Sequence, residues 1–219
     1  MAGMAIHAPV LVVPGLWASD WTMRPLAQML RRRGHAVVPA RIGINVGCTS
    51  DLVDRLERRL EASLAHYGRR AAIVGWSRGG TLAKLVTIRR PDLVSALITL
   101  GSNNVNPMAV SRMVELQIRL LNRLNAVGVR QFLSSDCVNG ECADSMRALL
   151  TSPYPSHIPY TSIYSKTDGV VDWRACCDPD AELVEVRASH FQLGVDPRVM
   201  RLVAERFDAL ERADQSAAS

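Results

Sequence analysis

The sequence has almost no lysine, few aromatic residues and no long apolar run. Lys84 and Lys166 are the only lysines, so arginines spread along the chain carry nearly all of the positive charge behind the net charge of +5. Aromatic residues make up only 5%. A nucleic-acid interface needs a basic stripe with aromatic side chains, so the composition argues against a nucleic-acid partner. No apolar run approaches the roughly 20 residues that span a bilayer, which argues against a transmembrane segment.

The sequence also lacks the patterns of a secretory leader and of a zinc site. The start, MAGMAIHAPVLVV, has no basic n-region, so we expect no signal peptide and a cytoplasmic protein. The five cysteines, at positions 48, 137, 142, 176 and 177, form no pair of C-x-x-C motifs, so we expect no metal. In the cytoplasm, we expect reduced thiols. The alternative is a disulfide between Cys137 and Cys142, which lie on either side of a turn.

Strand and helix patterns alternate along the chain, whose 219 residues suit one domain, 1–219. The apolar runs predict strands and the apolar residues at helical spacing predict helices. Strands are expected at 8–13, 35–40, 71–76, 93–100, 158–164 and 181–186, and helices at 24–33, from Thr49 or Ser50 to Gly68, from 78 to 90, near 143–150 and at 196–210. Because the strands expected up to 93–100 are apolar rather than alternating, they predict a parallel sheet covered by helices on both sides.

The alternation breaks after Gly101. Residues 103–157 are expected to form a helical insertion, with one long helix at 108–127 that has a wide apolar arc and a narrow arginine-rich stripe. This helix has two possible roles. It is an ordinary scaffold element, or it is a cap over a pocket at the edge of the sheet, and its position as an insertion between two strands favours the cap. As a cap, it would line one side of the pocket with Met113, Leu116, Leu120 and Leu124.

The segment Gly75-Trp76-Ser77-Arg78-Gly79 follows one expected strand and precedes an expected helix. A G-x-S-x-G match in that context indicates a nucleophile elbow, because the tight turn lifts the serine hydroxyl above the sheet. The hydroxyl also lies at the N-terminus of the helix that follows, which is the positive end of the helix dipole. The alternative is that Ser77 is only a small residue in a helix-capping turn.

A nucleophilic serine needs a general base, usually a histidine oriented by a carboxylate. Asp168 comes after the strand expected at 158–164, and His190 comes after the strand expected at 181–186. Both therefore belong to loops at the carboxyl edge of the sheet, where open α/β folds place their sites. Asp172 is a rival for the acid. The other histidines are expected to be surface or structural residues; they are His7, His35, His66 and His157.

The segments VVPGLWAS, VGWSRGG, IYSKTDGVVDW and SHFQLGVDP, in this order, resemble α/β-hydrolases of the small lipase and esterase type. The resemblance covers nearly the whole chain. It implies a short α/β-hydrolase fold with about six mostly parallel strands. It also implies Ser77 as nucleophile, Asp168 as acid and His190 as base, with backbone N–H groups of Leu16 and Arg78 in the oxyanion hole. Trp17 and Trp76, next to these positions, are expected at the substrate pocket.

The expected activity is hydrolysis of a small-molecule or lipid-like carboxylic ester, with short to medium acyl chains, through an acyl-enzyme. No cofactor is expected. The alternatives that keep the same three residues are a thioesterase, an acyltransferase and a lipase. A ligand-binding protein that kept the fold without turnover is the alternative from another class. The sequence does not indicate the oligomeric state.

Overall fold

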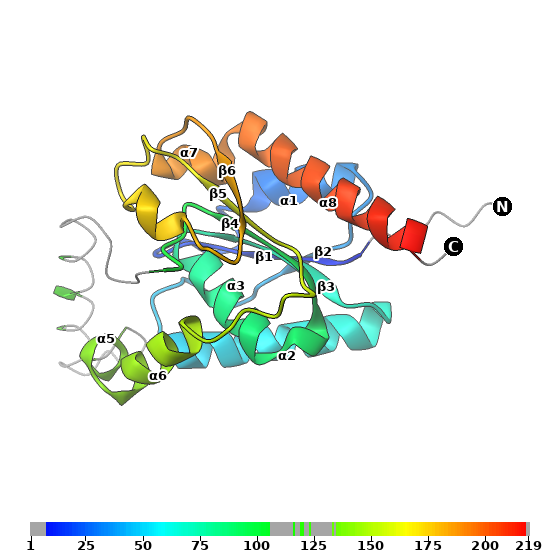
Figure 1. The fold of residues 1–219 in the computed structure, drawn as a ribbon. Helices are drawn as coiled ribbons and strands as arrows, with labels where there is room; N and C mark the ends of the chain where they lie inside the picture. The colour runs from blue at the N-terminus through cyan, green and yellow to red at the C-terminus, as the bar shows by residue number, and fades with distance from the viewer. Residues whose placement is uncertain are drawn as a thin grey trace.

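Six parallel strands form one sheet in the order β2-β1-β3-β4-β5-β6 (Figure 1). The structure, a computed structural model, describes residues 8–105, 116, 119, 120, 123, 133 and 135–217. The strands are β1 Val10–Val13, β2 Val37–Pro39, β3 Ala71–Trp76, β4 Val94–Leu100, β5 Tyr160–Tyr164 and β6 Glu182–Glu185. The central strands are buried on both faces, as their uninterrupted apolar sequences require.

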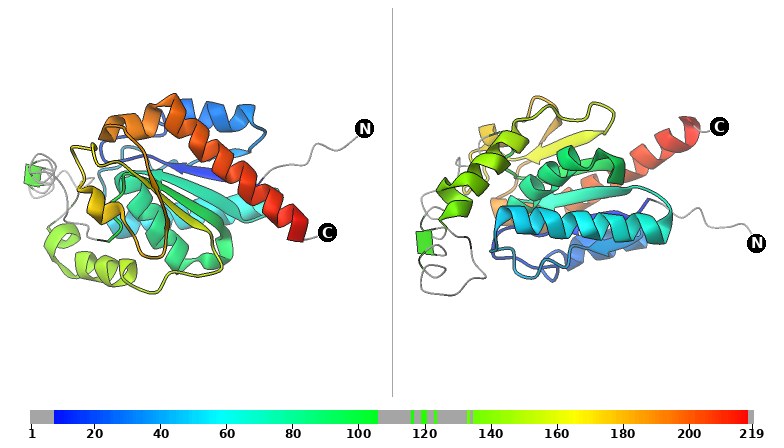
Figure 2. Two further views of the ribbon diagram at one scale, coloured as in Figure 1. Left: turned by 45° about the horizontal axis from the view of Figure 1, so that its top comes forward. Right: turned by 90° about the horizontal axis from the view of Figure 1, so that it is seen from below.

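Helices cover both faces of the sheet (Figures 1 and 2). They are α1 Arg24–Arg32, α2 Thr49–Tyr67, α3 Arg78–Arg89, α5 Asp136–Asn139, α6 Glu141–Leu150, α7 His190–Val195 and α8 Pro197–Ala217, with short 3₁₀ turns at Pro91–Leu93 and Trp173–Cys176. One apolar cluster joins the sheet to α2, α3 and α6, and a second joins it to α1, α7 and α8. The expected short α/β-hydrolase architecture is confirmed.

The strand ends place four loops along one edge of the sheet. Parallel pairing puts Gly75 of β3 opposite Thr99 of β4, and Thr99 opposite Ser162 of β5. All of these strands point the same way, so the loops that follow β3, β4, β5 and β6 meet at their carboxyl ends. The sequence segments around residues 77, 101, 168 and 190 therefore come together.

Two helix ends differ from the sequence prediction. Helix α2 is capped by Cys48 instead of Thr49 or Ser50, while Gly68 ends it with φ 66° as expected. Helix α8 continues to Ala217, so the expected end at 210 was wrong. Glu211 explains the extension, because its buried carboxylate accepts from the Ala8 N–H and pairs with Arg69.

The helix predicted at 108–127 lies mostly outside the described residues. The four described positions within it, Leu116, Arg119, Leu120 and Arg123, are helical and exposed. Met113 and Leu124 fall outside the described part. Among the helices of the described residues, none combines the length and the apolar character needed to cross a bilayer.

Candidate active site

Ser77 occupies the turn between β3 and α3 in a strained backbone conformation. Its φ of 54° and ψ of −130° lie outside the regions that residues with a side chain favour, and its N–H donates to the Leu100 carbonyl at 2.8 Å. A Cβ added to Gly75 would lie 2.5 Å from the Gly80 backbone nitrogen. Only glycine at 75 lets the strand and the helix approach this closely, so the sequence builds the elbow locally.

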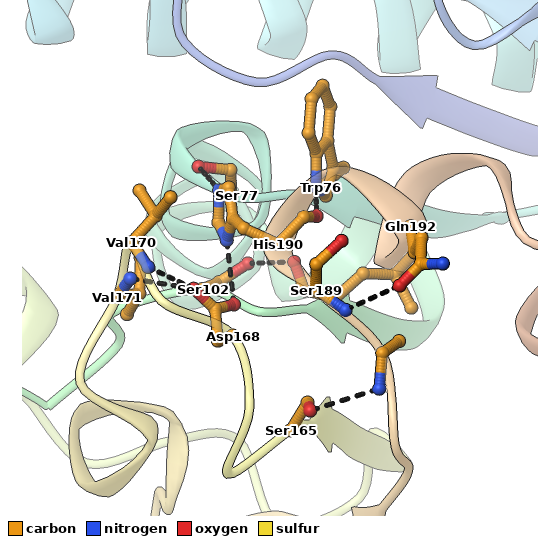
Figure 3. Close-up of polar contacts among 12 residues, drawn as sticks. Trp76, Ser77, Ser102, Ser165, Asp168, Val170, Val171, Ser189, His190 and Gln192 are labelled. Atoms are coloured by element: carbon orange, nitrogen blue, oxygen red, sulfur yellow. Dashed lines mark hydrogen bonds and ion pairs between the residues drawn. The ribbon is translucent and has the colours of Figure 1, made fainter.

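His190 stands between Ser77 and Asp168 and contacts both (Figure 3). Its Nε2 lies 2.9 Å from Ser77 Oγ, and its Nδ1 lies 2.7 Å from Asp168 Oδ2. The residue is the first of α7, where Ser189 forms a capping box with Gln192, and its N–H donates to the Asp168 carbonyl. The imidazole is thus held in a fixed orientation with one nitrogen directed at the serine hydroxyl.

The backbone after β5 orients the carboxylate of Asp168. Asp168 Oδ1 accepts from the N–H groups of Val170 at 2.9 Å and Val171 at 2.7 Å, which leaves Oδ2 for His190 (Figure 3). The rival, Asp172, is exposed and accepts instead from the Arg174 N–H, at the start of a 3₁₀ turn. The geometry therefore favours Asp168 as the partner of the imidazole.

Three of the other four histidines lie within the described residues. His35 is buried and bonds Asp208 at 3.0 Å, whereas His66 and His157 are exposed. His7 lies outside the described residues. Structural or surface roles fit the three described side chains.

Trp76 and Gly101 lie next to His190 and Asp168 and help to hold them in place. Trp76 is buried, and its Nε1 donates to the His190 carbonyl at 3.0 Å. Gly101 has φ 56°, and a Cβ there would lie 2.6 Å from Leu193 Cδ1 and 3.0 Å from Asp168 Oδ2. Sequence reasoning missed Gly101, although a glycine directly after a buried strand is a signal of close approach.

A fully buried asparagine connects the loops that carry the two expected oxyanion donors. Asn45 Nδ2 donates to the Pro14 carbonyl at 2.8 Å, and its main chain bonds the N–H of Trp17 and the carbonyl of Ala18. Its Oδ1 accepts from Arg78 Nη1 at 2.6 Å. Asn45 thereby ties the loop after β1 to the residue after Ser77. No spacing pattern in the sequence indicates this role for Asn45.

The Arg78 guanidinium is embedded among neutral oxygens. Besides Asn45, it donates to the Gly47 carbonyl at 2.8 Å and to Thr49 Oγ1 at 3.1 Å. Burial lowers the pKa of Arg78 to about 10, an effect opposed by Cys137 and Cys48. The assignment of the backbone N–H groups of Arg78 and Leu16 to the oxyanion hole stays a prediction.

A buried ion pair anchors the elbow helix α3. Lys84 Nζ lies 2.5 Å from Asp178 Oδ2, and the Tyr160 hydroxyl donates to the same oxygen at 3.3 Å. Burial, together with the charge of Asp178, raises the pKa of Tyr160 well above its usual range, which keeps that donor protonated. The Tyr160 oxygen in turn accepts from Asn104 Nδ2 at 2.7 Å.

The expected pocket residues are only partly placed. Trp17 is 42% exposed, in the loop after β1, and has φ 61°. Leu116 and Leu120 are 63% and 51% exposed, and Met113 and Leu124 lie outside the described residues. The pocket assignment of all six residues, Trp76 included, stays a prediction.

The three polar side chains form a hydrogen-bonded chain from a hydroxyl through an imidazole to a carboxylate. Such a chain can take the proton from the hydroxyl as its oxygen attacks an electrophilic carbon.

The family model described as "Alpha/beta hydrolase family" matches residues 10–218. The chain belongs to the α/β-hydrolase family. This membership agrees with the resemblance of the four sequence segments.

Solved structures of other α/β-hydrolases share the fold at low sequence identity. The mature lipase BlEst2 of Bacillus licheniformis superposes with a TM-score of 0.70 at 16% identity, over 93% of both chains. A structure from a study of carboxylesterases of Nitrososphaera gargenis gives 0.63 at 19%, over 97% of this chain and 93% of that one. The putative non-heme bromoperoxidase BpoC of Mycobacterium tuberculosis gives 0.62 at 17%, over 92% of each. No curated protein matches the chain significantly.

Proposed function

We propose that this α/β-hydrolase cleaves carboxylic esters by way of an acyl-enzyme formed on Ser77. The observation that carries the proposal is the chain of contacts from Ser77 Oγ through His190 to Asp168, at 2.9 and 2.7 Å. Neutral imidazole at His190 accepts the hydroxyl proton while Oγ attacks the ester carbonyl. Asp168 holds Nδ1 protonated, so that Nε2 is the nitrogen free to act as base.

The following steps use the same groups. The tetrahedral intermediate places its oxyanion at the backbone N–H groups of Leu16 and Arg78, each worth roughly 3 kcal/mol. His190 then returns the proton to the leaving alcohol, and the acyl group stays on Ser77. A water molecule, deprotonated by His190, attacks the acyl-enzyme; the bond to Ser77 Oγ then breaks, His190 returns the proton to Oγ, and the acid is released.

The substrate we propose is a small-molecule or lipid-like ester with a short to medium acyl chain. An apolar acyl pocket gains roughly 0.8 kcal/mol for each buried methylene, so the rate should rise with chain length until the pocket is full. The insertion between β4 and β5 is of modest size, which favours a limited pocket. The lipase and carboxylesterase names of structural neighbours fit an ester, although likeness at this identity speaks only for the fold.

The test is hydrolysis of p-nitrophenyl esters of graded acyl length by the wild type, by S77A and by the control S152A. Ser152 lies just after α6, where its hydroxyl donates to the Ala148 carbonyl at 3.0 Å. We expect S77A to lose at least about 10³-fold in rate and S152A to match the wild type. Full activity in S77A contradicts the mechanism. A preference for thioesters would instead favour the thioesterase alternative. A sharp rise in the hydrolysis rate with emulsified long-chain substrate would favour the lipase alternative.

A further inference from the structure

Three cysteines from separate segments meet beside the elbow. Cys48 caps α2, Cys137 belongs to α5 and Cys142 to α6. Their sulfur atoms all lie within 4.8 Å of one another, and those of Cys48 and Cys142 are 3.5 Å apart. The three side chains are half-buried thiols. Because about ninety residues separate Cys48 from the other two, no spacing motif in the sequence indicates this cluster.

The spacing of the sulfurs suits one shared metal ion. Zinc binds thiolates at about 2.3 Å in a tetrahedral arrangement, which sets neighbouring sulfurs about 3.8 Å apart. The observed separations, from 3.5 Å up to a limit of 4.8 Å, need shifts of at most about 1 Å to reach that value. A disulfide joins only two sulfurs at about 2.05 Å and would leave the third thiol unused.

The charge around the cluster points to an anionic occupant. Arg78 donates to oxygens on both sides of Cys48, those of Gly47 and Thr49, and to Asn45, and all of these oxygens are neutral. Within the described part of the chain, no carboxylate pairs with this guanidinium. A buried charge is stable only with compensation. A divalent ion with three thiolates carries a net charge of −1, which would compensate the guanidinium where no carboxylate of the described residues does.

We propose that Cys48, Cys137 and Cys142 bind one thiophilic divalent metal ion of the zinc type. Binding converts M²⁺ and three thiols into M(S-Cys)₃⁻ and releases three protons to solvent, with no change of oxidation state. The fourth tetrahedral position is left to water or another small ligand. The ion links α5 and α6 of the insertion to the start of α2 and, through Arg78, to the loop held by Asn45. The site is structural and does not depend on the proposed esterase reaction.

Cobalt is the probe for the full-length reduced protein, because thiolate ligands give Co²⁺ intense near-ultraviolet charge-transfer absorption. We expect one Co²⁺ per chain with that absorption, and displacement of the cobalt by Zn²⁺. C48S, C137S and C142S should each weaken Zn²⁺ binding by at least about tenfold, whereas C177S should bind like the wild type. Zn²⁺ should also raise the Tm of the wild type and not that of the triple variant.

Alkylation of the wild type keeps the test decisive where a serine variant fails to fold. Zn²⁺ should slow the reaction of iodoacetamide with Cys48, Cys137 and Cys142 and leave the rate at Cys177 unchanged, as mapped by peptide mass. Absence of the thiolate absorption, or equal protection of Cys177, overturns the proposal. So does a reduced protein that binds no metal and, on air oxidation, loses 2 Da by joining Cys48 to Cys142. None of these readouts uses ester hydrolysis.

Discussion

Asn45 Oδ1 accepts a 2.6 Å hydrogen bond from Arg78 Nη1, and this contact joins the loop after β2 to the residue that follows Ser77. The amide nitrogen of the same Asn45 donates to the Pro14 carbonyl, in the loop that carries Leu16. One buried side chain thus holds the two segments whose N–H groups are proposed to bind the oxyanion. Asn45 is a positioning residue, since it acts through these segments and not on the substrate.

Replacing Asn45 by alanine should lower kcat about 10- to 100-fold with little change in KM, because a small displacement of the donors affects mainly the transition state. The unpartnered buried groups should also cost about 1–3 kcal/mol in the free energy of unfolding. Steady-state kinetics and urea denaturation measure both effects. In N45D, Oδ1 still accepts from Arg78 but the donor to Pro14 is lost. Stability should therefore recover more than kcat, and full kcat in N45D would contradict the role given to the Pro14 contact.

The two candidate acids can be separated by amide substitutions. In D168N, the backbone N–H groups of Val170 and Val171 still require an acceptor at Oδ1, so the amide NH₂ turns toward His190. The imidazole must then accept at Nδ1 and carry its proton on Nε2, the wrong tautomer for a base. We expect kcat to fall on the order of 10³- to 10⁴-fold. D172N is the matched control and should keep near-normal kcat; the reverse ranking would move the acid to Asp172.

Gly101 should not tolerate a side chain. G101A places a Cβ 2.6 Å from Leu193 Cδ1 and 3.0 Å from Asp168 Oδ2, at φ 56°. The substitution should displace the carboxylate from His190 and reduce kcat by at least about tenfold, in addition to about 1–3 kcal/mol of strain. G68A is the control, because Gly68 has a similar φ of 66° with nothing within 4 Å of an added Cβ. Its expected loss is in stability alone, and equal loss of kcat in both variants would argue against a specific effect on the contact between Asp168 and His190.

Lys84 should matter for stability through its partner Asp178. K84M leaves a buried carboxylate without its cation, which costs about 3–5 kcal/mol in the free energy of unfolding. In the double variant K84M/D178N, a neutral amide can still accept from the Tyr160 hydroxyl, so most of this loss should be recovered. Chemical denaturation of the two single variants and the double variant measures the coupling. Additive losses would mean that the two side chains do not stabilise the fold as a pair.

Much of the fold follows from local sequence patterns. A strand forms within each of the six segments where one was expected, and Gly68 ends α2 in the left-handed conformation that favours glycine. The extension of α8 to Ala217 was not predictable locally, because it depends on Glu211 contacting Ala8 and Arg69. The short helix α7 was missed because its six residues contain too few turns for a helical period.

For the site, too, sequence position identifies some residues, whereas others could be found only from contacts between distant segments. Ser77, Asp168 and His190 follow strand ends, so a parallel sheet brings their loops to one edge without further knowledge of contacts. The choice between Asp168 and Asp172 required the backbone geometry after β5. Asn45 and the three-cysteine cluster were missed because each joins segments that no sequence spacing relates.

The most direct test of the serine mechanism is labelling by a fluorophosphonate, read as the mass increase of the intact protein and mapped by peptide sequencing. The account predicts one label per chain, on Ser77, none in S77A and greatly slowed labelling in H190A. Labelling of a different serine, or no labelling of the folded wild-type protein, would contradict the account.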